Sequence, residues 1–184
     1  RSTLDRSSAA SDVYKRQDFA GILTAINTKF GDGFATVDEE AAPETVRVSS
    51  SQWGELAPFL REEDTLSFDA MMCITGIDEG AESENLGVVY NFHSMKHNHK
   101  LEVYVPTPRI APKVPSVEQI WRIADWFERE TYDMFGIEFE GHRDLRRILL
   151  PSDWEGFPLR KDYQFPETYR GDVEDIMKER WEKL

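Results

Sequence analysis

The chain has 184 residues, with 35 Asp and Glu against 22 Lys and Arg, and its formal net charge is -13. This length suits one domain with an extension, and the acidic excess repels phosphate backbones, so we expect no nucleic-acid partner. The single cysteine excludes an internal disulfide and an iron-sulfur cluster held by this chain alone, and no apolar run approaches the roughly 18 residues of a membrane span.

The chain begins with a polar stretch and then a helical pattern. Residues 1–17, RSTLDRSSAASDVYKRQ, have no apolar segment long enough for a signal peptide and no helical stripe, so we expect an artefactual or disordered leader. From Asp18, apolar residues at helical spacing predict a first helix that stops at GDG. Its stripe consists of Phe19, Ile22, Leu23, Ile26 and Phe30.

The middle of the chain has the pattern of a sheet. FATVDEE and TVRVSS predict short strands, and Ser51 is the expected N-cap of a second helix that carries Trp53 and Leu56. LSFDAMMCITGID, LGVVYNFHSMKH and KLEVYVPT predict longer strands, and Cys73 in the first of them is expected to be a small buried hydrophobe. PTPRIAPKVPS has four prolines and predicts a stiff connector at a domain edge or crossover.

A third helix is predicted from Ser116 to Phe135. Ser116 and Gln119 have the spacing of a capping box, and Gly136 is a suitable helix stop. The expected buried stripe consists of Ile120, Ala124, Phe127, Thr131 and Met134.

This order of elements predicts an α+β fold, with helices packed on a mainly antiparallel sheet and a long extended C-terminal segment. We divide the chain into a leader, residues 1–17, an α+β domain, residues 18–140, and an extended partner-binding tail, residues 141–184. A short helix is expected in the tail near VEDIMKERWEKL.

Acidic residues and a histidine around the third helix are candidates for acid-base chemistry. Glu128, Glu130, Asp133 and His142 have the side chains of an acid, a base and a metal ligand. On an ideal helix, however, Glu128 lies on a different face from Glu130 and Asp133, and Arg129 has the spacing of a surface ion pair with Asp133. We therefore expect structural salt bridges and no catalytic residue in this chain.

No metal or cofactor site is expected elsewhere. His93, His97 and His99 form H-x3-H-x-H, but lysines flank them and no cysteine or acid completes a ligand set. The chain has no Walker loop, dinucleotide fingerprint or nucleophile elbow.

The segment after the third helix is dense in arginines and aromatic residues, which are enriched at protein interfaces. Its apolar spacing is too irregular for folding on itself, so we expect it to be mobile alone and to bind a larger protein. The expected motif and interface residues are Glu128, Arg129, Glu130, Asp133, His142, Arg146, Arg147, Trp154, Arg160, Lys161 and Tyr163.

The run ERETYDMFGIEFEGHRDLRRILL resembles the defining motif of the C subunit of NADH-quinone oxidoreductase, the 30 kDa subunit family of respiratory complex I. The matching residues are Glu128, Arg129, Glu130, Asp133, Met134, Phe135, His142, Arg146, Ile148 and Leu149. The similarity continues through PLRKDYQFP and, more loosely, back to about Asp18. The family usually has proline after the histidine, and Arg143 in its place restores a backbone donor.

This resemblance implies a peripheral subunit on the cytoplasmic side of the cell membrane, without a membrane span of its own. It implies that FMN, iron-sulfur clusters and quinone are bound by other subunits, and that the C-terminal segment wraps the large subunit bordering the quinone site. The complex would transfer electrons from NADH to quinone and translocate protons, with this chain supporting assembly and geometry. Two alternatives are the equivalent subunit of a related membrane-bound hydrogenase or ferredoxin-linked complex, and a freestanding enzyme using Glu128 and His142.

Overall fold

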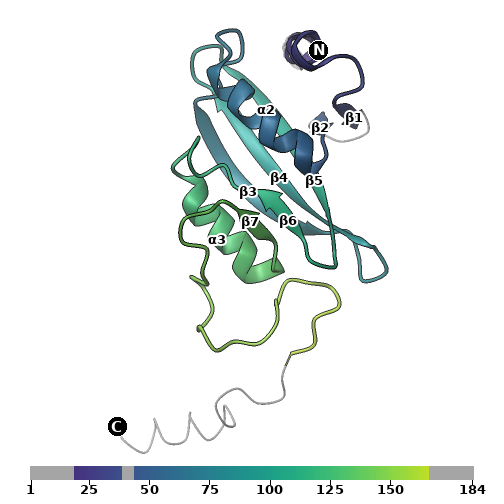
Figure 1. Cartoon of the computed structure of the whole chain (residues 1–184), viewed down its shortest axis with the longest axis vertical. Helices are drawn as coiled ribbons and strands as arrows, with labels where there is room; N and C mark the ends of the chain where they lie inside the picture. Colours follow the sequence, from purple (N-terminus) through teal and green to yellow (C-terminus); the bar gives the residue numbers. More distant parts are fainter. Residues whose placement is uncertain (1–18, 39–43, 166–184) are drawn as a thin grey trace, which may run out of the picture.

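The computed structural model describes residues 19–38 and 44–165, and a five-stranded sheet lies at its centre (Figure 1). The strands are β1 Thr36–Asp38, β2 Thr45–Arg47, β3 Ala70–Asp78, β4 Asn85–Ser94 and β5 His99–Pro108. Their order is β1-β2-β5-β4-β3, and every neighbouring pair is antiparallel except β2 and β5. The predicted α+β fold on a mainly antiparallel sheet is confirmed.

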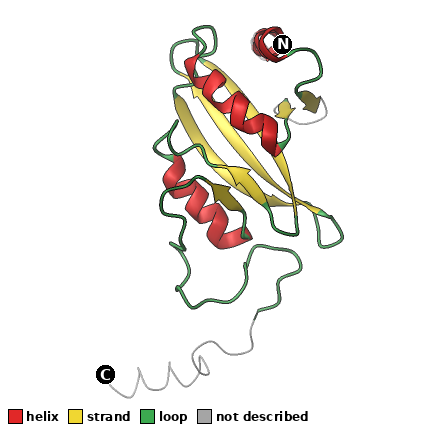
Figure 2. Ribbon diagram, viewed as in Figure 1, coloured by secondary structure: helices red, strands yellow, loops and turns green. Residues whose placement is uncertain are grey.

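Among the described residues, three helices accompany the sheet (Figure 2). They are a first helix over residues 19–30, α2 Ser50–Glu62 and α3 Ala124–Phe135. In Figure 2, α2 lies over the sheet, along its long strands, and α3 lies beside β3, against which it packs. The first helix is joined to α2 through the rings of Phe30 and Phe59, whose centroids are 5.3 Å apart.

The core lies between the helices and one face of the sheet. Alternate residues of the central strands, such as Val88 and Tyr90 on β4 and Val103 on β5, have no exposed surface. Trp53 of α2 packs on Tyr90 at a ring distance of 4.3 Å. The predicted stripe of the first helix is confirmed at Ile22, which is 1% exposed. Alternate residues of the strands and the apolar stripes of the helices thus form one core.

The N-cap of α2 lies two residues earlier than predicted. Ser49, not Ser51, is the N-cap: its hydroxyl accepts the backbone N–H of Gln52, and the Gln52 side chain accepts the backbone N–H of Ser49. This reciprocal pair is a capping box.

The predicted start of α3 is wrong. Residues 117–123 form turns, and regular helix begins only at Ala124. Ser116 does not cap this helix, because its hydroxyl donates to the carboxylate of Glu128. The predicted end is confirmed, since Gly136 adopts the left-handed conformation with φ 70°.

The proline-rich run is a crossover within the domain. β5 includes Pro106, as does the strand predicted from KLEVYVPT, but also Pro108, which was predicted to lie in the connector; the two prolines pair with Gly87 and Asn85 of β4. The parallel neighbour β2 reaches only residue 104 of β5, so neither missing N–H interrupts a ladder on that side. The chain then turns into β6, Lys113–Pro115, which pairs in parallel with β7, Glu138–Glu140.

The position of Cys73 differs from the prediction, because this residue is half-buried. It alternates along β3 with Ile74, which faces the core, so its own side chain lies on the opposite face. No helix within residues 19–38 and 44–165 is long and apolar enough to cross a membrane. The leader and the predicted C-terminal helix lie outside the described residues.

Candidate functional site

The turn before α3 folds back over Glu128. Ser116 donates its hydroxyl to Oε2 of Glu128 at 2.6 Å, and the backbone N–H of Val117 donates to Oε1 at 2.7 Å. The Glu128 side chain has no exposed surface. Burial raises the pKa of Glu128 to about 7; the two hydrogen bonds oppose this rise, and the carboxylates of Glu118 and Asp125 add to it. The charge of this carboxyl group is therefore governed by burial.

His142 closes over the same carboxylates. Its side chain has no exposed surface, and its Nε2 lies 3.5 Å from Oδ1 of Asp125 and 4.0 Å from Oε2 of Glu128. The backbone N–H of Asp144 donates to Nδ1 at 3.0 Å, which leaves the ring proton on Nε2. The structure brings Glu128 and His142 together, which the helix geometry did not predict, whereas Glu130 is exposed and Asp133 binds a different part of the segment after α3. Glu128 and His142 nevertheless offer no surface for a substrate to contact.

Arg143 ties this cluster together from outside. Its guanidinium donates to Oδ2 of Asp125 at 2.5 Å and lies 3.2 Å from a carboxylate oxygen of Glu118. Its backbone N–H donates to Oε1 of Glu118 at 3.3 Å. The backbone donor of Arg143, which a proline at this position would lack, is thus used in the structure.

Asp133 fastens the segment after α3, residues 141–165, which we call the strap. The Asp133 side chain has no exposed surface. Its Oδ2 accepts the backbone N–H groups of Ile148, Leu149 and Leu150 at 3.0, 2.7 and 2.9 Å. One carboxylate oxygen thereby fixes three consecutive residues of the strap.

Arg147 completes this anchor. Its guanidinium donates to Oδ1 of Asp133 at 2.8 Å and to the backbone oxygen of Gly156 at 2.8 Å. Burial opposes ionisation of Asp133, but the amide and guanidinium donors outweigh it and lower the pKa of this carboxyl. The predicted pair between Arg129 and Asp133 is not formed, since the charged partner of Arg129 is Asp125 at 3.9 Å.

Asp78, at the end of β3, is a second anchor for the strap. Its side chain is 1% exposed, and its Oδ2 accepts the backbone N–H of Lys161 at 2.8 Å. Arg109 binds both oxygens of Asp78 and also lies 3.2 Å from Asp162 of the strap. Burial opposes ionisation of Asp78, but hydrogen bonds from Arg109, Lys161 and Gly80 outweigh it and lower the pKa to about 2.

Between the two anchors, the strap packs on the C-terminal end of α3. The backbone N–H of Leu159 donates to the oxygen of Met134 at 3.1 Å, and Nε of Arg160 donates to the oxygen of Phe135 at 2.6 Å. The ring of Phe157 covers Gly136 so closely that a Cβ at this position would overlap it. The described part of the strap therefore packs against the α+β domain of the same chain. The irregular apolar spacing of the strap did not predict this packing.

The predicted interface residues of the strap fall into two groups. Arg147 and Arg160 face the domain, as described above. Arg146, in contrast, is 68% exposed in its side chain, and its ion pair within the described part of the chain is with the exposed Asp144. Lys161 is exposed, and Tyr163 covers Gly156 and donates to the backbone oxygen of Glu155. Trp154 is half-buried, with its ring 6.4 Å from that of Phe165.

The three histidines of the H-x3-H-x-H run bind separate groups. Nε2 of His93 lies 3.2 Å from Asn98 Oδ1, whereas Nε2 of His97 and of His99 lie at 2.8 and 2.9 Å from the backbone oxygens of Asp64 and Leu66. Among the described residues, no group of three histidine, cysteine or acidic side chains has the arrangement of a metal site.

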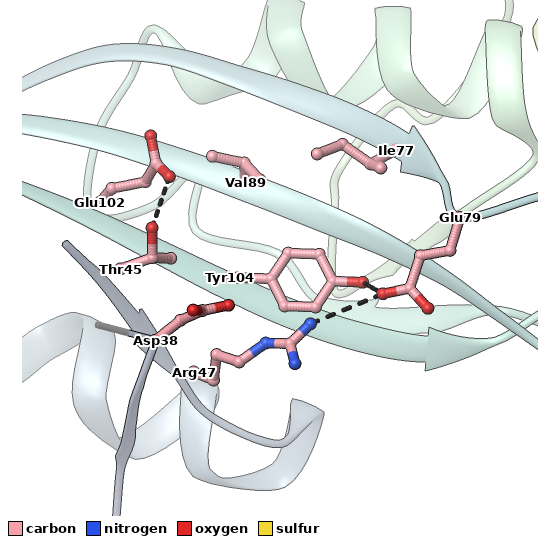
Figure 3. Close-up of a pocket in the computed structure, with 8 residues that line it drawn as sticks. All are labelled: Asp38, Thr45, Arg47, Ile77, Glu79, Val89, Glu102 and Tyr104. Atoms are coloured by element: carbon pink, nitrogen blue, oxygen red, sulfur yellow. Dashed lines mark hydrogen bonds and ion pairs between the residues drawn. The ribbon is translucent and has the colours of Figure 1, made fainter. Parts of the chain in front are cut away.

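The face of the sheet opposite the core carries a shallow depression of about 240 Å³ (Figure 3). Glu79 accepts a hydrogen bond from the hydroxyl of Tyr104 and lies 3.6 Å from Arg47. Glu102 accepts a hydrogen bond from the hydroxyl of Thr45 at 2.7 Å. These polar groups satisfy one another across the strands. The residues that line the depression include no histidine and none of the buried acids of α3, so it is separate from the cluster around Glu128.

Sequence reasoning missed the residues that complete these clusters. Asp125, Ser116, Asp78 and Arg109 were not candidates, although they bind His142, Glu128 and the strap. The spacing of Asp125 four residues before Arg129 was a visible signal for an ion pair. Nothing in the local pattern of Asp78 indicates that it binds a residue as distant as Lys161.

The chain matches the family described as respiratory-chain NADH dehydrogenase, 30 Kd subunit, over residues 46–169. It is 49% identical over 148 residues to the NADH-quinone oxidoreductase C subunit of Chloroherpeton thalassium, covering 79% of this chain and 61% of that protein. It is 46% identical over 148 residues to the corresponding C subunit of Chlorobium phaeobacteroides, covering 79% of this chain and 89% of that protein. The chain thus spans about three fifths of the first relative's length.

Two solved structures share the fold. The trypsin-resistant fragment (1-134) of Nqo5 has a TM-score of 0.59 at 25% identity, covering 70% of this chain and 99% of that chain. One chain of the membrane-bound sulfane sulfur reductase, an archaeal respiratory membrane complex, has a TM-score of 0.64 at 22% identity, covering 88% of this chain and 89% of that chain. The second likeness concerns the fold alone.

Proposed function

The chain belongs to the family of the 30 kDa subunit of respiratory-chain NADH dehydrogenase, and from this premise we propose that it is a peripheral subunit of an NADH:quinone oxidoreductase that binds a larger subunit through its strap. In this proposal the chain supports the geometry of electron transfer from NADH to quinone in a proton-translocating complex, on the cytoplasmic side of the membrane.

The observation that carries the proposal is the way in which the strap is held. Asp133 and Asp78 bind its backbone at residues 148–150 and 161, so its shape is set before any partner binds. Outward side chains remain available, since Leu149 is 59% and Leu159 is 51% exposed. Prior ordering of this kind lowers the entropy lost on association.

We further propose that flavin, iron-sulfur clusters and quinone are bound by other subunits. One cysteine among 184 residues does not supply the three or four thiolates of a common cluster. The absence of a glycine-rich phosphate loop from the sequence argues in the same direction for flavin and nicotinamide nucleotides.

A related membrane-bound complex with another donor remains the second candidate. It is supported by the likeness to the archaeal complex, which is one of fold alone at 22% identity. The relatives at 46 and 49% identity are both C subunits of NADH-quinone oxidoreductases, and they favour the first candidate.

The proposal is tested by charge reversal on the outer side of the strap. Arg146→Glu in the full-length chain should leave the unfolding curve unchanged and reduce incorporation into the membrane complex, together with its NADH to quinone turnover. Arg147→Glu is unsuitable, because Arg147 is an internal partner of Asp133. Lys29→Glu, an exposed reversal on the first helix, is the matched control and should assemble normally. Normal assembly of the Arg146 variant would contradict the proposed role of the strap.

A further inference from the structure

The guanidinium of Arg129, on α3, is nearly enclosed and yet makes no hydrogen bond to the described residues. Its side chain is 8% exposed, and its Nε is fully buried without a hydrogen-bond partner. Its terminal nitrogens also form no hydrogen bond but, unlike Nε, keep some accessible surface. A guanidinium has five N–H donors, and leaving them unused in a buried position is unfavourable.

The neighbouring carboxylate does not satisfy this guanidinium. Oδ1 of Asp125 is 3.9 Å from a terminal nitrogen of Arg129, beyond hydrogen-bond distance. The other oxygen of Asp125 accepts from Arg143, and Oδ1 also faces Nε2 of His142 at 3.5 Å. Arg143 therefore holds the Oδ2 side of this carboxylate, and Oδ1 is buried without a hydrogen-bond partner among the described residues.

Trp126 lies directly over the same guanidinium. The carbon at the centre of the Arg129 guanidinium is 5.1 Å from the ring centroid, within the range of a cation-π contact. Trp126 itself is 58% exposed, an unusual position for so large an apolar ring. Tryptophan and arginine are among the residue types enriched at the positions that contribute most to binding energy in protein interfaces.

We infer that Trp126 and Arg129 form a docking site for an acidic side chain of a partner protein. A carboxylate provides two acceptor oxygens that match the planar fork of arginine, and the exposed ring supplies an apolar wall beside it. This inference rests on the proposed function, because it requires the chain to be part of a complex.

The surrounding charges favour a single carboxylate on a protein over a polyanion. Asp125, Glu130 and Asp144 lie near Arg129 in space or on the same helix, and the chain as a whole carries a net charge of -13. A phosphate backbone or an anionic membrane would bring many charges against these acids. One carboxylate placed at Arg129 meets a strong donor that makes no hydrogen bond to the described residues.

The inference is tested with three variants of the full-length chain, assembled with the other subunits of the complex. Trp126→Ala should leave the unfolding midpoint unchanged, because the ring is exposed, and should lower the affinity for the complex by at least about tenfold. Arg129→Gln should lower it at least as much. Arg122→Gln removes an exposed cation from the preceding turn and is the control that should bind normally.

A photo-cross-linking residue at position 126 identifies the partner directly. We expect cross-linking, in the assembled complex, to a peptide of another subunit that contains Asp or Glu. Reversal of that acid to Lys should restore the binding of an Arg129→Glu variant. Cross-linking only within the chain, or normal binding by both folded Trp126→Ala and Arg129→Gln chains, would overturn the inference. Failure of the unaltered chain to enter the complex would instead overturn the proposed function.

Discussion

Oε2 of Glu128 lies 4.0 Å from Nε2 of His142, and neither side chain has exposed surface. This contact joins the middle of α3 to the first residues of the strap. Because burial, more than any ion pair, sets the charge of Glu128, uptake of a proton by this carboxyl is coupled to folding of the region.

The stability of the chain should therefore contain a component that falls as pH rises. Folding raises the pKa of Glu128 from 4.5 to about 7, so the folded chain binds the proton more tightly. The resulting stabilisation is complete below pH 4.5 and is lost as pH rises through about 7. It amounts to roughly 3 kcal/mol. Urea unfolding at pH values across this window should show that Glu128→Gln lacks this fall.

Glu130→Gln is the control for this experiment, because Glu130 lies on the same helix but is exposed. The control should retain the pH dependence of the unaltered chain. Identical pH profiles for the Glu128→Gln variant and the unaltered chain would refute the assignment.

Asp133→Asn should loosen the strap. The substitution removes the charge that pairs with Arg147 and weakens the bonds to the three amides, and loss of a buried charged partner costs about 3 kcal/mol. Hydrogen exchange at Ile148, Leu149 and Leu150 should accelerate. Asp144→Asn, which removes an exposed carboxylate of the strap, should leave the free energy of unfolding and the hydrogen exchange of these three amides unchanged. Retained protection in the Asp133 variant would contradict the anchor.

Two glycine substitutions should have opposite effects on the free energy of unfolding. Gly54 lies inside α2, and a Cβ added there would meet its nearest neighbour, Pro115, at 3.6 Å, so Gly54→Ala should stabilise the chain by about 0.5–1 kcal/mol. A Cβ at Gly76 would overlap the ring of Phe135, so Gly76→Ala should destabilise the chain by about 1–3 kcal/mol. Chemical unfolding measures both effects, and the loss of stability in the Gly76 variant checks the packing of α3 on β3.

The purified full-length chain should be colourless. Its one cysteine and the lack of a nucleotide-binding loop in its sequence lead us to expect neither iron nor flavin in stoichiometric amount. Metal analysis and visible absorption after mild purification are the measurements. A flavin or cluster that remains with the chain through gel filtration would contradict this expectation.

Helices and strands with clear apolar periodicity were predictable from the sequence. Hydrogen bonds from side chains to the backbone of distant residues were not. The first helix and the three long strands follow apolar patterns that are confirmed by burial at Ile22 and Val88. β6 and β7 have three residues each, too few for an alternating pattern to stand out. The capping-box spacing at Ser116 was misleading, because tertiary structure offered its hydroxyl a buried carboxylate instead of a helix end.

The same limit applies to the candidate site. A helical wheel places Glu128 and Asp133 on the surface of α3, but only the fold shows that the turn at Val117 and the strap cover them. Their acceptor oxygens bind backbone N–H groups, which every residue except proline possesses. A partner of this kind leaves no mark in the sequence.

The attachment of the strap through its backbone has a consequence for divergence among related chains. Asp133 and Asp78 hold amides at residues 148–150 and 161, whichever side chains those residues carry. Only proline at these positions removes the donor. The outward side chains can therefore be exchanged to suit a different neighbour while the path of the strap is kept, so recognition and anchorage can evolve separately.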